Sequence, residues 1–180
     1  MAQAATTLGQ RIGSYRRRNS ITAADLASRS GAGLTRSIIA NIENGRRIDV
    51  TVTQLLAISR TLGVPPIALI FDIERPASTF EVERDGGPMT LGLTRAIEWF
   101  TGDPIEGPGE RTPAGDHAVR VLTALRAWER ARGRLGMAES RRNTATTRDD
   151  ALEAEIDELT QEVRELEGYL GSLNVDLTAG

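Results

Sequence analysis

The sequence predicts a mainly α protein, and three features of its 180 residues indicate this. Apolar residues recur at helical spacing over most of the chain, and residues that favour helix starts precede most of these runs. Residues 152–173 carry a heptad pattern without interruption. One short strand or hairpin is expected near 79–84, because Phe80 and Val82 alternate there with polar residues.

Five short helices are expected within residues 1–75, each beginning at a residue that favours a helix start. These residues are Thr7, Thr22, Thr35, either Thr51 or Thr53, and Pro66 in the first turn of the fifth helix. The first helix should span Leu8–Arg18, and Gly45 should end the third in a left-handed conformation. The fourth helix should turn its aliphatic residues inward: Leu55, Leu56, Ile58 and Leu62.

The rest of the chain is expected to form a connector, residues 76–115, and a helical association region, residues 116–180. In the connector, a helix should run from Thr90 to Thr101, before a linker rich in glycine and proline at 102–115. The association region should hold two helices separated by a polar stretch at 139–147. The first begins at Asp116, the second begins near Arg148, and the first carries an apolar stripe: Val121, Leu122, Leu125, Trp128 and Leu135.

The heptads of the last helix allow two arrangements. Branched residues at a with leucine at d favour a parallel two-stranded coil. In such a homodimer Glu162 would face Glu167 of the partner subunit, with no basic residue to relieve the repulsion. The alternative is an antiparallel helical hairpin, in which a connection of about twelve residues lets the acidic helix pack on the preceding helix and its arginines. Both stay open here, and a homodimer through the C-terminal helices is expected.

The residue composition limits the kinds of catalytic and metal sites that the chain can form. The chain has no cysteine and a single histidine, His117, so disulfides and thiolate metal sites are excluded and a histidine-based catalytic centre would rest on one side chain. We therefore expect neither an enzyme nor a cofactor or metal. The longest apolar stretch near the N-terminus, 64–71, is far shorter than the roughly 20 residues that span a bilayer, which predicts a soluble, cytoplasmic protein.

Charge is divided along the chain. Residues 1–75 hold ten arginines and five acidic residues, whereas residues 148–180 hold two arginines and ten acidic residues. Residues 1–75 are therefore suited to binding a polyanion. The acidic residues 148–180 offer a surface for a protein partner.

The most specific motif is the segment 39–47, Ile-Ala-Asn-Ile-Glu-Asn-Gly-Arg-Arg, followed by Leu-Leu-Ala-Ile at 55–58 and Leu-Gly-Val-Pro at 62–65. With five helices in order around it, the segment from Leu8 to Phe71 resembles the phage-repressor-like helix-turn-helix family. That family includes Cro and the xenobiotic-response-element type of bacterial regulator. The resemblance covers about a third of the chain and implies a DNA-binding domain whose third helix, about 35–44, enters the major groove.

Two positions depart from the family's pattern. Members commonly carry glutamine near the start of the second helix, where it reaches a phosphate, and Ala23 stands there instead. The turn before the third helix is about two residues longer, with Ala32-Gly33 as the extra residues. The resemblance further implies that Arg16 could pair with Asp25 and that Glu43 anchors the third helix.

The third helix carries residue types that read base edges. Arginine suits guanine, asparagine adenine, serine either, and alanine a thymine methyl group. The expected base-reading residues are Arg36, Ser37, Ala40 and Asn41. Ile38 could contact a base or cover the second helix. By resemblance, residues near the helix ends contact phosphates and position the protein without specifying a sequence: Thr35, Asn44, Arg46 and Arg47. In the basic run 16–18, Arg17 is either a solvated charge or a further phosphate contact.

These features predict a sequence-specific regulator of transcription that binds double-stranded DNA. Proteins of this type often occlude a promoter, which favours a repressor over an activator. The alternative is a protein-interaction adaptor or an antitoxin, whose acidic C-terminal helices bind a partner protein. The arginines at the reading and positioning sites favour DNA, because an adaptor that had abandoned DNA would not need them.

Overall fold

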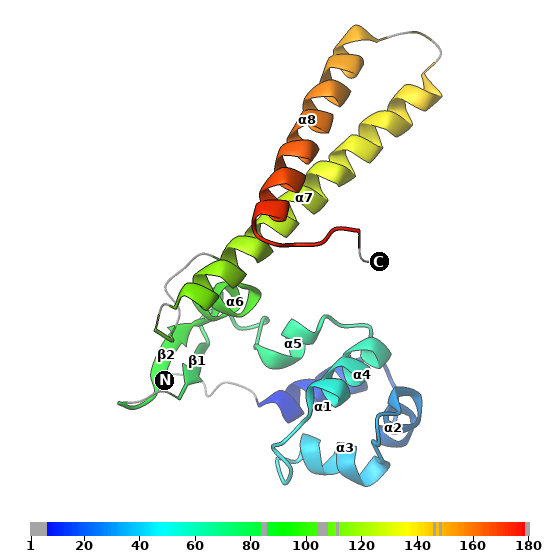
Figure 1. Cartoon of the computed structure of the whole chain (residues 1–180). Helices are drawn as coiled ribbons and strands as arrows, with labels where there is room; N and C mark the ends of the chain where they lie inside the picture. The colour runs from blue at the N-terminus through cyan, green and yellow to red at the C-terminus, as the bar shows by residue number, and fades with distance from the viewer. Residues whose placement is uncertain are drawn as a thin grey trace. The chain divides into compact units, whose positions relative to one another are not determined.

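The computed structural model describes residues 7–83, 86–103, 108–110, 112–145, 147 and 149–178. The chain is mainly helical, as expected, and its contacts divide it into two compact units, Met1–Ile97 and Glu98–Gly180. The first holds five helices, a two-stranded sheet and most of a sixth helix, and the second holds two long helices (Figure 1).

The five expected helices form in the described part of the first unit. They are α1 (Leu8–Arg18), α2 (Ala23–Ser30), α3 (Arg36–Glu43), α4 (Val52–Leu62) and α5 (Pro66–Ile70). Threonines cap the first four, and Thr7, Thr22 and Thr51 each complete a capping box with the residue three positions later. Of the two threonines that could begin the fourth helix, Thr51 is therefore the cap.

The core between these helices is aliphatic. Its most deeply buried members are Ile12, Leu26, Ile39, Ile42, Ile58 and Leu69. The prediction that Leu56 faces this core is wrong, because its side chain is 51% exposed. Adjacent residues lie about 100° apart around a helix, and the face of α4 that includes Leu55 and Ile58 meets the core.

A β-hairpin follows the five helices, in agreement with the extended segment expected near 79–84. Strand β1 (Thr79–Val82) pairs antiparallel with β2 (Met89–Gly92). Helix α6 (Leu93–Thr101) consequently starts three residues later than the predicted Thr90, because residues 90–92 pair with β1. The hairpin and α6 enclose a small core, in which the rings of Phe71 and Phe80 meet edge to face at 4.9 Å.

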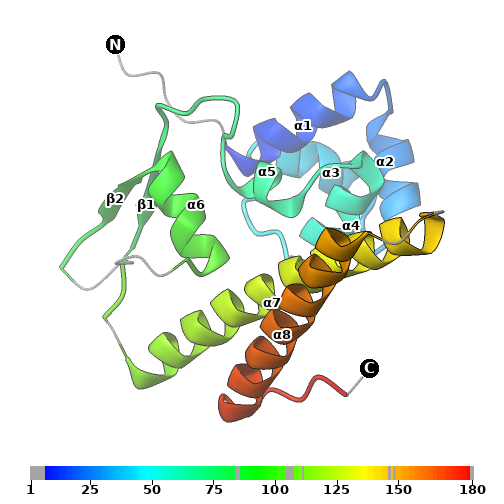
Figure 2. The same ribbon diagram turned by 90° about the horizontal axis from the view of Figure 1, so that it is seen from above.

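The second unit contains α7 (Pro113–Thr144) and α8 (Asp150–Ser172), which pack antiparallel (Figures 1 and 2). The predicted start of α7 at Asp116 is three residues late, because Thr112 caps the helix and Pro113 occupies its first turn. The polar stretch predicted at 139–147 is helical as far as Thr144. It contains neither glycine nor proline, and its Arg141 pairs with Glu155 of α8 at 2.7 Å.

The connection between the two helices is consequently 145–149 and not about twelve residues. Asp149 caps α8, and the predicted start near Arg148 falls outside the described residues.

Helix α8 buries its heptad seam against α7. The buried residues of this seam are Leu152, Ile156, Leu159, Val163 and Leu170. The buried residues of α7 are alanines at intervals of seven, Ala124, Ala131 and Ala138, whereas Leu122 of the predicted stripe is 41% exposed. Small residues on one helix allow the axes to approach closely, so the larger side chains of α8 fill the seam.

We expect Gly9→Ala to destabilise the first unit. A Cβ at this position would lie 2.0 Å from the carbonyl oxygen of Ile42, so α3 would have to move. The free energy of unfolding of the first unit should fall by about 3 kcal/mol, the upper range for overpacking. Urea unfolding followed by circular dichroism would measure this.

Two controls accompany that measurement. Trp128 lies in α7 of the second unit, so its fluorescence midpoint, measured with Trp99 replaced by phenylalanine, should not move. Gly136→Ala in α7 meets no atom within 4 Å and should leave the first unit unaffected. An unchanged first unit in Gly9→Ala would contradict the close contact between α1 and α3.

Candidate nucleic-acid interface

Helix α3 packs one face into the core and leaves the other accessible. Ile39 and Ile42 are buried, and Ile38 packs against the same core, so Ile38 covers the domain interior. Spacings of three and four residues place the four predicted base-reading residues together on the remaining surface. Two of them are exposed and two are half-buried: Arg36, Ser37, Ala40 and Asn41.

The predicted phosphate contacts lie at the two ends of α3. Thr35 caps the helix by accepting a hydrogen bond from the Ile38 N–H at 3.2 Å. At the other end, Asn44 is the C-terminal cap, and Gly45 adopts the expected left-handed conformation with φ of 69°. The chain thereby turns so that Arg46 is exposed.

Arg47 is tied to the same turn. Its N–H donates to the carbonyl oxygen of Asn41 at 3.0 Å, and its Nε donates to the carbonyl oxygen of Asp49 at 2.9 Å. Its two terminal guanidinium nitrogens make no hydrogen bond within the described part of the chain. Arg47 can therefore still offer two nitrogens to a ligand.

Arg17 is the predicted site residue that belongs to a different helix. It is exposed in the last turn of α1. A guanidinium nitrogen of Arg17 and a carboxylate oxygen of Glu43 lie 3.1 and 3.2 Å from the place that a Cβ on Gly13 would occupy. The fold thus brings Arg17 to the C-terminal end of α3.

The arginines around this surface form two groups. Those of the first group donate to carbonyl or carboxylate oxygens of the domain: Arg11, Arg16 and Arg18. Burial lowers the pKa of the Arg11 guanidinium, which donates to two carbonyl oxygens at the end of α5. In the second group, the guanidinium makes no hydrogen bond or ion pair with any described residue: Arg17, Arg36 and Arg46.

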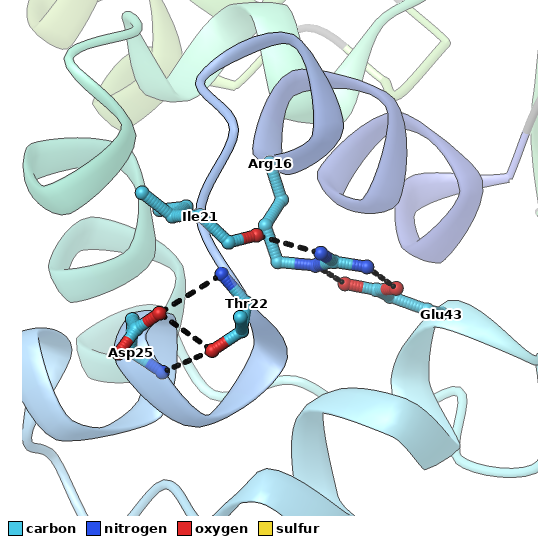
Figure 3. A network of polar contacts seen from close by, with 5 residues as sticks. All are labelled: Arg16, Ile21, Thr22, Asp25 and Glu43. Carbon is cyan, nitrogen blue, oxygen red and sulfur yellow. Dashed lines mark hydrogen bonds and ion pairs between the residues drawn. The ribbon is translucent and has the colours of Figure 1, made fainter.

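Arg16 and Glu43 join α1 to α3 through two parallel hydrogen bonds (Figure 3). The Arg16 Nε lies 2.6 Å from one Glu43 carboxylate oxygen, and a terminal nitrogen lies 2.9 Å from the other. The remaining terminal nitrogen donates to the carbonyl oxygen of Ile21 at 2.7 Å. Hydrogen bonding to Glu43 raises the pKa of the Arg16 guanidinium, and Glu43 anchors α3 as expected.

The suggested pairing of Arg16 with Asp25 is wrong. Asp25 accepts hydrogen bonds from the Thr22 N–H at 3.1 Å and from the Thr22 hydroxyl at 2.6 Å (Figure 3). These hydrogen bonds lower the pKa of the Asp25 carboxyl. Asp25 serves the cap of α2, and the acidic partner of Arg16 comes instead from the end of α3.

The lengthened turn before α3 uses three consecutive residues with positive φ. They are Gly31, Ala32 and Gly33, with φ of 67°, 54° and 69°. The turn is tied down by Leu34, which is buried in the core and whose N–H donates to the Gly31 carbonyl oxygen at 2.9 Å. Ala23, which replaces the family's glutamine, packs against the core and has no polar side-chain group to offer a phosphate.

Two residues that position α3 were not singled out by the sequence reasoning. Gly9 and Gly13 lie where α1 meets the end of α3, and a Cβ at either would be closer than ordinary contact. Their spacing of four residues on one helical face was the available signal. Glycine within a helix costs roughly 0.5–1 kcal/mol relative to alanine, so two on one face indicate a close approach.

Comparison with known proteins agrees with this geometry. A family model described as helix-turn-helix matches residues 12–69. These residues are a helix-turn-helix domain of the phage-repressor-like family. The match supports a DNA-binding regulator of transcription. Neither a curated protein nor a solved structure matches the chain. Among the helices of the described residues, none is long and apolar enough to cross a membrane.

Replacing Glu43 should test how the helix-turn-helix domain holds α3. We expect Glu43→Gln to lower the free energy of unfolding by about 3 kcal/mol, because it leaves a largely buried guanidinium without its counter-charge. The Arg16 and Glu43 side chains are only 15% and 12% exposed. Urea unfolding followed by circular dichroism is the measurement.

The matched control is Asp25→Asn, which removes one carboxylate but keeps a side-chain acceptor at the start of α2. Its cost should stay below about 1 kcal/mol, the typical worth of a helix cap. Equal losses in the two variants would argue that Arg16 depends on both carboxylates and would contradict the assignment.

Proposed function

We propose that this regulator represses transcription by binding a specific DNA site with α3 in the major groove. An α-helix fits that groove, where each base pair presents a distinct set of donors and acceptors. The observation that carries the proposal is the unpaired state of Arg17, Arg36 and Arg46 among the described residues, beside arginines that the domain uses internally. Repression would follow from occlusion of a promoter.

In this proposal the residues of the candidate interface divide into those that contact base edges and those that contact phosphates. Arg36, Ser37, Ala40 and Asn41 contact base edges, and the support is their shared face opposite the core. The positioning residues contact phosphates: Thr35, Asn44, Arg46, Arg47 and Arg17. Thr35 and Arg47 already make hydrogen bonds within the domain, so they would use their remaining groups.

We propose that residues 1–75 bind DNA, that 76–115 form a connector and that 116–180 mediate association.

The second candidate function, an adaptor or antitoxin, would use the acidic face of α8. Three glutamates of that helix already lie within 4 Å of arginines of α7: Glu153, Glu155 and Glu162. The acidic surface left for a protein partner is therefore narrower than the composition suggests, and a gel shift on random duplex at low salt separates the two functions.

Base reading can be tested with a duplex selected from a random library. Asn41→Ala and Arg36→Ala should each weaken binding to the selected site by on the order of 1–3 kcal/mol and hardly change binding to random duplex. The reason is that only contacts with base edges discriminate between the two DNAs. Titration of both duplexes gives the affinities, and equal losses on both would show that these residues contact phosphates.

The matched control is Arg46→Ala, which removes a proposed phosphate contact. It should weaken binding to both duplexes alike and make the salt dependence shallower by roughly one unit of slope.

A homodimer through the C-terminal helices remains our proposal for the association region. Because α8 buries its seam against α7, two hairpins would have to meet through their polar outer faces. Light scattering should give a dimer mass for the full chain and a monomer mass after truncation at Gly115. A dimer that survives the truncation would place the interface in the first unit, and a monomeric full chain would contradict the proposal.

A further inference from the structure

A groove of about 400 Å³ lies on one flank of the α7–α8 hairpin. Five residues of α7 and one of α8 line it, and we call these six the α7 groove: Ala127, Arg130, Gly133, Arg134, Met137 and Glu162. Met137 is 72% exposed, and a Cβ on Gly133 would meet no atom within 4 Å. The described part of the chain therefore leaves the groove open to another molecule.

The two helices bring opposite charges to this flank. Arg134 pairs with Glu162 at 2.6 Å, and Arg141 pairs with Glu155 at 2.7 Å. Arg130 lies one turn before Arg134 on the same side of α7, and it makes no ion pair with any described residue. The flank is therefore basic along α7 and acidic along α8, and one of its arginines still lacks a counter-charge.

These ion pairs also fix which residues of the two helices lie level with one another. The step of seven residues between the two paired arginines of α7 matches the step between the two paired glutamates of α8. A further step of seven, about two helical turns, places Ala127 level with Tyr169. Tyr169 is 45% exposed and lies on the same side of α8 as Glu162. Exposed aromatic side chains of this kind are enriched at protein interfaces.

We propose that Tyr169 of each copy fills the α7 groove of the other in a four-helix bundle of two chains. The inference rests on the homodimer proposed above and names its contact surface. A two-fold axis parallel to the helices lays each α7 on the α8 of the other copy without shifting their levels. Ala127 then lies level with Tyr169 of the second copy. A helical side chain inclines toward the N-terminus of its helix, which on this α8 leads from Ala127 toward Gly133.

Charge selects this orientation of the two hairpins. A two-fold axis perpendicular to the helices would lay α7 on α7 and α8 on α8, so that like charges oppose one another, which suppresses association. The parallel axis sets the arginines of each α7 against the glutamates of the other α8. Arg130, four residues before Arg134, then lies level with Leu166 of the second copy, four residues after Glu162. Beside Leu166 is the exposed Glu165, which makes no ion pair with any described residue.

Filling the groove tests the inference on the full chain. Gly133→Leu places a side chain in the α7 groove, and Tyr169→Ser removes its proposed occupant. Each should weaken the dimer by at least about tenfold, measured by light scattering over a concentration series. Gly136→Leu is the matched control, because position 136 is equally open but does not line the groove. Leucine favours a helix over glycine, and circular dichroism confirms that each variant is folded.

Exchange of charge between two variants is the second test. Arg130→Glu and Glu165→Arg should each weaken their own homodimer by at least about fivefold, because each sets like charges level with one another. An equimolar mixture of the two variants should recover the dimer mass, because each then meets the opposite charge in the other. Recovery on mixing requires a contact between chains, since mixing leaves a contact within one chain unchanged.

The outcomes separate this inference from the homodimer on which it rests. A dimer that persists in Gly133→Leu and Tyr169→Ser, or a mixture of the charge variants that stays dissociated, would overturn the groove contact and leave the homodimer standing. An equal loss in Gly136→Leu would also overturn it, because that side chain lies outside the groove. A monomeric unaltered chain would contradict the homodimer, and the inference would fail with it.

Discussion

The ion pair between Arg16 and Glu43 is the contact on which the proposed DNA-binding face depends. It joins the end of α1 to the end of α3 with two parallel hydrogen bonds, and the third hydrogen bond of Arg16 holds the carbonyl oxygen of Ile21 just before α2. One guanidinium thus fixes three elements relative to one another. Its side chain is largely withdrawn from water, so loss of the glutamate would leave an uncompensated charge.

Gly9 and Gly13 make that pairing possible by removing side-chain bulk where α1 meets α3. The Cα of Gly9 faces the carbonyl oxygen of Ile42, and the space over Gly13 is taken by the groups of Arg17 and Glu43. The same close approach that holds α3 also brings Arg17 beside it. The structural Arg16 and the candidate DNA-contacting Arg17 are therefore neighbours. They differ because Arg16 donates hydrogen bonds to Glu43, whereas the Arg17 guanidinium has no hydrogen-bond acceptor among the described residues.

In the second unit, small side chains of one helix pack against large side chains of the other, and ion pairs flank this seam. Helix α7 contributes alanines to the seam and arginines to its margin, whereas α8 contributes large aliphatic residues and glutamates. Trp128 of α7 contacts residues of both charges. Its indole N–H donates to Glu167 of α8 at 3.2 Å, and its ring centroid lies 4.6 Å from the Arg132 guanidinium. Since the buried aliphatic residues of α8 already pack against α7, a coil between two chains would have to give up an interface already made within one.

The sequence by itself determined the five helices α1 to α5 and nearly all of their caps, and it supplied the candidate DNA-contacting residues, because these depend on local chemistry. Threonine caps and Gly45 act within four residues of chain, and the family motif lies in one helix and its flanks. Tertiary structure alone decided which acid pairs with Arg16, since Asp25 and Glu43 carry the same charge and only the fold places one of them within reach. It also decided that Leu56 faces outward and that alanines line α7, because hydrophobicity does not say which of two adjacent apolar residues meets a neighbour, whereas packing admits only one.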